Sequence, residues 1–336
     1  MIGRTIAVAF LMLGLLPAQP IRIKMATLAP KDTYWHQALL QMGERWRQIS
    51  GGKVSLTVFA GGVDGDEPQM VRMMRVGQLQ AAGLSGSGLA QIDRSVNCLQ
   101  LPLMLDSDAE LDWVRERMSP RLEKILESKG FVLLSWSDVG WVYFFTKKPA
   151  ARPDDLRKMK LFTWLGDNET LELYKASGFH PVPLEATGIL MGLQTGLIDS
   201  FDVPPLAALA NQWFPLAPYM IDLKWAPLVG AMVVSKPSWD RVPEPFREPM
   251  LEAARASSEQ IRTEVRKLGA EAVTAMQKRG LKVTTLDTAA LADWRREVDA
   301  IYPKLRGRYV PADLFDEVRT LRNQYRSQGG PTGDRQ

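Results

Sequence analysis

The 336-residue sequence is poor in the residues from which disulfide frameworks and metal sites are built. It contains one cysteine, Cys98, and two histidines, His36 and His180. A single cysteine cannot form an intrachain disulfide, and so few sulfur and imidazole groups argue against a metal site built on them. We therefore expect no disulfide, no metal ion and no cofactor.

An excess of charge of one sign is also lacking. The 42 basic and 38 acidic side chains give a formal net charge of +4, and the two signs are mixed along most of the chain. Proteins that bind nucleic acid gather basic residues into a patch, so no nucleic-acid partner is predicted. The hydrophobic fraction of 46% is typical of packed domains, and the length suffices for about two of them.

Long hydrophobic runs are absent apart from one short run near the N-terminus. Residues 6–16 are apolar, follow Arg4 and end before Pro17. This pattern is typical of a secretory signal sequence, here residues 1–20, and predicts export to the periplasm. Leu16 stands where cleavage prefers a small residue, so a retained leader that tethers the protein to the membrane stays an alternative. No later stretch has the roughly 20 apolar residues that a spanning helix needs.

The period of the hydrophobic residues switches repeatedly between that of strands and that of helices. Apolar and polar residues alternate in residues 21–25, as in a strand, and residues 34–49 then have the spacing of a helix that stops at Gly51. Strands alternating with helices predict an α/β fold. The further predicted strands are 54–58, 81–84, 131–136, 141–146 and 158–164, and the further predicted helices include 70–74 and 108–128.

The strand pattern begins again near Gly140, which indicates two α/β units. Residues 243–279 have no glycine before Gly269 and have proline only in the first turns. A helix of this length measures roughly 40 to 50 Å and could bridge two domains. We also predict helix in residues 288–326 and a flexible tail over residues 329–336.

No motif in the sequence predicts an enzyme. Residues 83–88 resemble a nucleophile elbow or a dinucleotide loop, but Ser87 and Gln91 stand where these motifs need glycine. The acidic residues Asp64, Asp66 and Glu67 lack the spacing of a calcium loop and fit a polar turn before a helix.

Seven separated segments resemble, in the same order, the DctP family, the extracytoplasmic solute-binding proteins of TRAP transporters. They are residues 25–30, 49–54, 58–63, 70–80, 101–105, 152–160 and 193–199. The resemblance implies two α/β lobes with a closing ligand cleft and a long bridging helix. Lobe 1 is expected over 21–138 plus 228–265, and lobe 2 over 139–227 plus 266–328. It also implies delivery of a solute to TRAP membrane subunits.

The sequence departs from this family at the positions that hold the substrate carboxylate in most relatives. Phe162 replaces the usual arginine, Trp141 and Val142 stand where a second arginine is common, and Val203 replaces a polar residue. Leu184 replaces an aromatic residue. Because a carboxylate enclosed without a partner costs several kcal/mol, we expect weak binding of the usual acids.

The predicted ligand is therefore a largely apolar or aromatic, possibly lipid-like molecule, which can keep a carboxylate at one exposed end. Orienting polar groups are expected from Ser85, Thr163 and Asp202, among others. Two alternatives stay open. One is a periplasmic carrier or interaction module of the same fold that is not coupled to a TRAP permease, and the other is an organic-acid binder with a non-standard cationic contact such as Lys31. The predicted ligand-binding residues are Tyr34, Trp35, Ser85, Trp141, Tyr143, Phe162, Trp164, Leu184, Val203 and Trp213.

Overall fold

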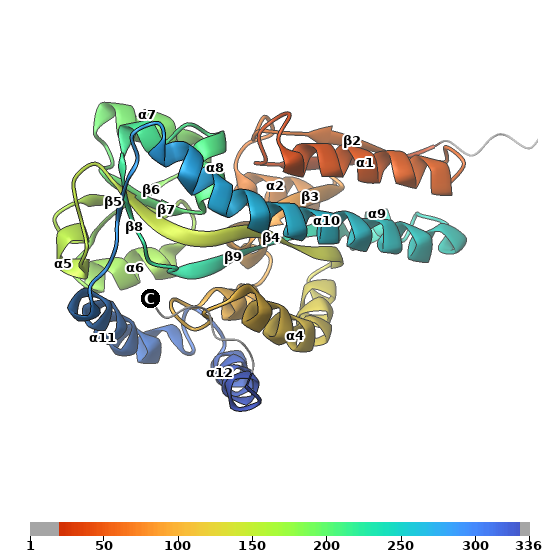
Figure 1. The fold of residues 1–336 in the computed structure, drawn as a ribbon. Coiled ribbons are helices and arrows are strands. Elements are labelled where there is room, and N and C mark those ends of the chain that lie inside the picture. Colours follow the sequence, from red (N-terminus) through yellow and green to blue (C-terminus); the bar gives the residue numbers. More distant parts are fainter. Residues whose placement is uncertain (1–19, 330–336) are drawn as a thin grey trace, which may run out of the picture.

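The computed structural model describes residues 20–329 and contains two lobes built on a shared strand, β4 (Figure 1). In the first lobe the strand order is β2-β1-β3-β9-β4. Strand β1 runs parallel to β2 and β3, whereas β9 is antiparallel to β3 and β4. The bounds are β1 Ile21–Thr27, β2 Val54–Phe59, β3 Ala81–Ser85, β4 Phe131–Thr146 and β9 Ala226–Ser235.

The second lobe is built on the end of β4. There β4 pairs antiparallel with β7 on one side and β8 on the other, and β5 lies parallel between β7 and β6. Strand β10 extends this sheet by pairing with β8. The bounds are β5 Lys160–Trp164, β6 His180–Leu184, β7 Ser200–Val203, β8 Tyr219–Ile221 and β10 Lys282–Thr284.

Strand β4 passes from one lobe to the other without a break. The sequence predicts two strands here, over 131–136 and 141–146, and this division is wrong because β4 runs through all 16 residues. Its register against β9 shifts between Asp138 and Gly140, and Gly140 has a φ of +127°, which favours glycine. The conformational break that the glycine marks is therefore a bulge inside one strand.

The long helix predicted over 243–279 is confirmed as α10, Glu244–Gln277, with 34 residues (Figure 1). It packs against α1 (Tyr34–Ile49) in the first lobe, against β4, and against α8 (Pro205–Ala210) in the second lobe. The fully buried Trp46 of α1 donates a hydrogen bond from Nε1 to the Met250 carbonyl oxygen at 2.9 Å. Helix α10 therefore spans both lobes.

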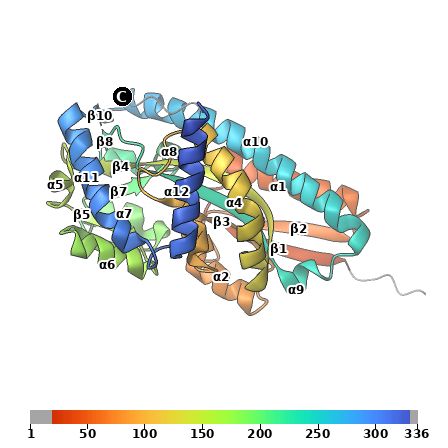
Figure 2. The same ribbon diagram turned by 90° about the horizontal axis from the view of Figure 1, so that it is seen from below.

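The remaining helices cover the sheets, and α12 lies beside α4 (Figure 2). The helical region predicted over 288–326 is in fact two helices, separated at Gly307, which has a φ of +90°, and Pro311. The bounds are α2 Glu67–Arg75, α3 Gly86–Ala90, α4 Asp108–Ser128, α5 Pro153–Leu156, α6 Asn168–Ala176, α7 Ile189–Thr195, α9 Lys236–Trp239, α11 Thr288–Leu305 and α12 Ala312–Ser327, with short 3-10 helices at Arg94–Gln100, Ala186–Gly188 and Phe214–Leu216.

Two of the predictions concern residues outside the described range. The signal sequence falls on residues 1–19 almost entirely, and the predicted flexible tail falls mostly on residues 330–336. Within residues 20–329, no helix combines the length and the apolar character that crossing a membrane requires.

Candidate functional site

A cavity of about 440 Å³ lies between the two lobes. The first lobe contributes the segment after β1, the end of β3 and the middle of β4. The second lobe contributes the ends of β5 and β7 and the helix α8. A volume of this size is within the range of small-molecule sites, so this is the candidate ligand site.

Half of the sequence-predicted ligand-binding residues line this cavity. Trp35 and Ser85 come from the first lobe. Trp164, Val203 and Trp213 come from the second lobe and give its side of the cavity two indole rings. Whether these side chains contact a ligand is still a prediction.

Phe162 does not lie at the cavity surface, where the sequence predicts it. It is fully buried in the core of the second lobe, and its ring meets that of Trp164 edge to face at 5.4 Å between centroids. Since residues two apart on a strand share one face, Phe162 lies behind Trp164. Leu184 packs on the same core without lining the cavity.

The other predicted residues lie elsewhere. Tyr34 packs on the small core formed by Ala38, Ile261 and Val265. Trp141 and Tyr143 line a second cavity of about 190 Å³ next to the first. The proposed orienting groups Thr163 and Asp202 alternate with cavity-lining residues along β5 and β7, which places them on the opposite strand faces.

The cavity wall contains a buried carboxyl group that the sequence analysis assigned only to a turn. Glu67 is 2% exposed and accepts hydrogen bonds from the Ser85 backbone N–H and the Ser85 hydroxyl, both at 2.6 Å. Burial raises the pKa of the Glu67 carboxyl to about 7. A Cβ atom at Gly88 would lie 2.8 Å from Oε2 of Glu67, so the glycine leaves room for this carboxyl. The glycines at residues 83, 86 and 88 therefore indicated, already in the sequence, that another group packs closely against this segment.

Asp66 joins the two lobes beside the cavity. Its Oδ1 accepts from the Glu67 backbone N–H at 2.7 Å and caps α2, which confirms the predicted polar turn before a helix. Its Oδ2 accepts from the Ala186 backbone N–H of the second lobe at 2.6 Å. Burial raises the pKa of the Asp66 carboxyl. This side chain therefore links the lobes in the arrangement that the structure describes.

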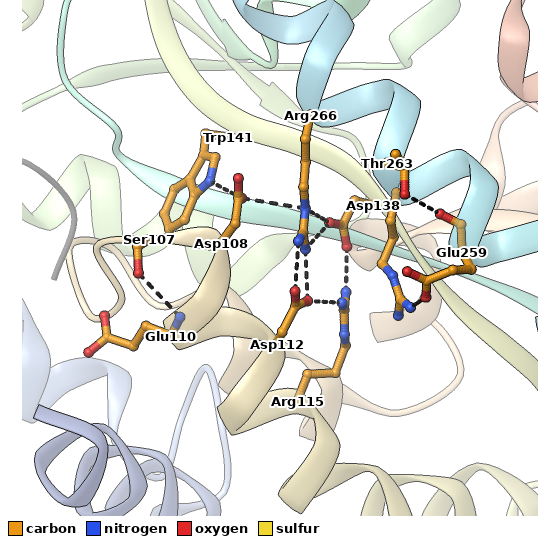
Figure 3. Close-up of polar contacts among 11 residues, drawn as sticks. Ser107, Asp108, Glu110, Asp112, Arg115, Asp138, Trp141, Glu259, Thr263 and Arg266 are labelled. Carbon is orange, nitrogen blue, oxygen red and sulfur yellow. Dashed lines mark hydrogen bonds and ion pairs between the residues drawn. The ribbon is translucent and has the colours of Figure 1, made fainter. Parts of the chain in front are cut away.

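A second buried carboxylate in the wall, that of Asp138 on β4, is fully paired (Figure 3). Arg115 of α4 donates to Asp138 and to Asp112. Arg266 of α10 donates to Asp138 at 2.7 Å and to Asp112 at 2.6 Å. The two arginines therefore neutralise the two aspartates, and both guanidinium groups are held by the protein itself.

Among the described residues that line the main cavity, Lys31 alone has a basic side chain. It is exposed and lies after β1, and within residues 20–329 it forms no ion pair. The remaining walls combine apolar side chains with the small polar groups Thr27, Ser85, Ser137, Thr187 and Asn211. An anion could therefore find a cationic partner at the Lys31 end of the cavity.

Comparison with known proteins places this architecture in a family. The family model described as bacterial extracellular solute-binding protein, family 7 (DctP), matches residues 25–307. The chain belongs to this family. The predicted family and the predicted two-lobed α/β fold are thus confirmed, and with them the class of solute-binding proteins of TRAP transporters.

Individual relatives are distant in sequence and close in fold. The 2,3-diketo-L-gulonate-binding periplasmic protein YiaO of Escherichia coli is 22% identical over 265 residues, 77% of this chain and 79% of that protein. The sugar acid binding protein DctPAm of Advenella mimigardefordensis, solved with galactonate, has a TM-score of 0.85 at 19% identity and covers 91% of this chain and 99% of that chain. A TRAP periplasmic solute-binding protein of Ralstonia eutropha, solved with (S)-2-acetolactate, has a TM-score of 0.84 at 22% identity, with 90% and 99% covered.

Proposed function

We propose that this protein is the periplasmic solute-binding subunit of a TRAP transporter and captures a monocarboxylate with a largely apolar body. The observation that carries this proposal is the composition of the cavity wall, which combines one unpaired lysine with two indole rings and aliphatic side chains. The relatives named above bind organic acids, which supports a carboxylate as the charged group. The solute would then pass to the membrane subunits of the transporter.

The charges of the cavity favour one carboxylate over two. Lys31 supplies one unpaired positive charge, whereas Asp138 is already neutralised by its arginines. Glu67, when ionised, repels a second carboxylate in the deeper part of the site. A dicarboxylate would therefore leave one of its charges without a partner, which costs free energy in a partly desolvated site.

The apolar body of the ligand is argued from the second lobe. Trp164, Val203 and Trp213 remove apolar surface of a bound molecule from water, at about 25 cal/mol per Å². A sugar acid buries hydroxyl groups instead, and each needs a hydrogen-bonding partner. Among the described lining residues, the second lobe contributes Thr187 and Asn211 as polar side chains, besides the indole N–H groups of its two tryptophans.

Calorimetric titration with a panel of acids tests this proposal. The panel contains 4-methyl-2-oxopentanoate, galactonate and succinate, and we expect the first to bind most tightly. In Lys31→Met the dissociation constant for this acid should rise about tenfold, because a hydrogen bond to a charged group is lost. Lys24→Met, which removes an exposed lysine of β1 that does not line the cavity, is the matched control and should bind normally.

Two results would contradict the proposal. Tight binding of succinate with no binding of the apolar acid would show that the charge argument is wrong. Equal affinities in wild type and Lys31→Met would remove Lys31 as the carboxylate partner. Mass spectrometry of molecules that co-purify with the protein gives an independent view of the ligand class.

A further inference from the structure

Trp141 and Tyr143 line a second cavity, which we call the hinge cavity. It has a volume of about 190 Å³ and follows the main cavity along α10, from Val265 to Val273. Its floor is the part of β4 that enters the second lobe, and its sides are the start of α8 and the residues before β9. Asp138, Val139, Pro204 and Leu228 line both cavities and form the wall between them.

The size of the hinge cavity suits one aromatic ring. Apolar cavities of about 150 Å³ in proteins bind benzene. The hinge cavity is somewhat larger, and its apolar lining residues include Trp141, Leu206 and Val273. A ring carrying one small polar substituent therefore fits its volume.

Two polar groups of the hinge cavity have no hydrogen-bonding or ionic partner within residues 20–329. One is the hydroxyl of Tyr143, which is protonated at neutral pH and can donate. Burial, with smaller effects of Asp222 and Asp108, raises the pKa of this phenol further. The other is the ammonium of Lys224, which lies 5.7 Å from the centre of the Trp141 ring and forms no ion pair. Both groups donate hydrogen bonds to an anion.

The other charged groups that line the hinge cavity, Asp108, Asp138 and Arg266, belong to a larger cluster. In this cluster Asp108, Asp112 and Asp138 face the arginines Arg115, Arg262 and Arg266, so three negative charges are offset by three positive ones. Asp108 accepts from Trp141 Nε1 at 2.8 Å and lies 3.6 Å from Arg266, which also pairs with Asp138 (Figure 3). Lys224 thus supplies the unpaired charge among the described lining residues. Asp222, which acts on Tyr143, and Lys224 are both exposed, so salt weakens the effect of each charge on the cavity to a similar degree.

From this arrangement we infer that the hinge cavity is a second binding site, for a small aromatic monocarboxylate. The ring packs against Trp141, and the carboxylate accepts hydrogen bonds from Lys224 and the Tyr143 hydroxyl. This site is separate from the proposed solute site, so the inference does not depend on which acid the main cavity takes.

Gly269 allows the hinge cavity to be closed without disturbing the fold. It lines the cavity inside α10, and a Cβ atom added there would meet no atom within 4 Å. Any ordinary residue favours the helix interior more than glycine by about 0.5–1 kcal/mol. Gly269→Phe should therefore fill the cavity, and Gly269→Ala is the matched control that leaves most of it open.

The test uses benzoate as the probe and fluorine NMR of protein labelled with 5-fluorotryptophan. The signal of Trp141 is assigned with Trp141→Phe, and those of Trp164 and Trp213, which line the main cavity, are assigned in the same way. Benzoate should shift the Trp141 signal in wild type and in Gly269→Ala but not in Gly269→Phe. Benzyl alcohol, which lacks the charge, should shift it much less.

Two further variants test the polar contacts. In Lys224→Met the dissociation constant read from the Trp141 signal should rise about tenfold, and in Tyr143→Phe severalfold. Lys31→Met should leave this constant unchanged. A benzoate titration that shifts only the Trp164 and Trp213 signals, or that shifts Trp141 equally in Gly269→Phe, would overturn the inference. If Gly269→Phe does not fold, an unchanged constant in Lys224→Met would overturn it as well.

Discussion

The two lobes contribute different chemistry to the cavity between them. The first lobe supplies all of the charged side chains of the described wall, Lys31, Glu67 and Asp138. The second lobe supplies the indole rings of Trp164 and Trp213 together with aliphatic residues. The family resemblance implies a carboxylate-binding arginine in the second lobe, at the position of Phe162. In this protein the basic side chain among the described lining residues, Lys31, lies on the other side of the cavity.

This difference has a physical basis in how each lobe holds its groups. A buried charged group needs a hydrogen-bonding or ionic partner. In the first lobe Ser85 donates hydrogen bonds to Glu67, and Arg115 pairs with Asp138. Behind the second-lobe wall lies an aromatic core with Phe162, Phe145 and Phe201, which offers no partner for a charge. A charge on that side would therefore be unpaired unless the ligand itself carried the opposite sign.

Removing Arg115 should have the largest effect on stability, because the buried carboxylate of Asp138 loses one of its two cationic partners. Arg115→Met leaves the buried Asp138 with Arg266 as its remaining partner, and we expect a loss of about 3 kcal/mol in the free energy of unfolding. Urea unfolding measures it. Arg121, whose ion pairs with Asp313 and Glu317 are exposed, is the control, and Arg121→Met should lose about 1 kcal/mol or less. Equal losses of stability in the two variants would show that the buried ion pairs of Arg115 contribute no more than the exposed ion pairs of Arg121.

Titration of Glu67 should make the free energy of unfolding of the protein depend on pH. Its pKa is about 7 in the folded protein and 4.5 as the ordinary value, so the folded state binds the proton more tightly. The protonated carboxyl therefore stabilises the folded state fully below about pH 4.5, and this contribution is lost as the pH rises through about 7. The free energy of unfolding should fall by up to about 3 kcal/mol over this range. Unfolding curves of wild type and Glu67→Gln across this range isolate the contribution. Parallel pH profiles for the two proteins would contradict it.

Asp66 tests whether the polar first lobe also holds the second lobe in place. Asp66→Ala removes the helix cap and the bond to the Ala186 N–H, and it should lower the free energy of unfolding by about 1–2 kcal/mol. It should also weaken binding of the acid identified by titration severalfold. Asp287→Ala removes a comparable cap on α11 and an exposed ion pair with Arg152, neither of which joins the two lobes, and should change stability alone. Unchanged affinity in Asp66→Ala would show that the hydrogen bond between the lobes does not contribute to ligand binding.

Adding a positive charge to the apolar wall of the second lobe should have the smallest effect on stability. Leu190 lines the second-lobe side and is 38% exposed, so Leu190→Lys should change the free energy of unfolding by about 0.5 kcal/mol or less. The new ammonium gives succinate a partner for its second carboxylate, and its affinity should rise severalfold. Leu197→Lys, at an exposed position away from the cavity, is the control. No gain in succinate affinity would mean that the lack of a cation in the second lobe is not what weakens succinate binding.

The family, the two-lobed α/β class and the long helix α10 were predictable from the amino-acid sequence alone. These features rest on local patterns, namely the period of the apolar residues, the glycines that end helices and seven separated segments. Such patterns act over a few residues and survive in any tertiary context that buries the same faces. The acidic turn at Asp66 was predictable for this reason.

Tertiary structure decided which side chains reach the cavity and which charges are paired. A strand pattern shows that Phe162 and Trp164 share a face, but the depth of each along that face depends on what packs over the strand. Likewise, the pairing of Asp138 with Arg115 and Arg266 joins residues 23 and 128 positions apart. The electrostatics of the site depend on such distant contacts, so no local pattern distinguishes these paired arginines from the unpaired Lys31.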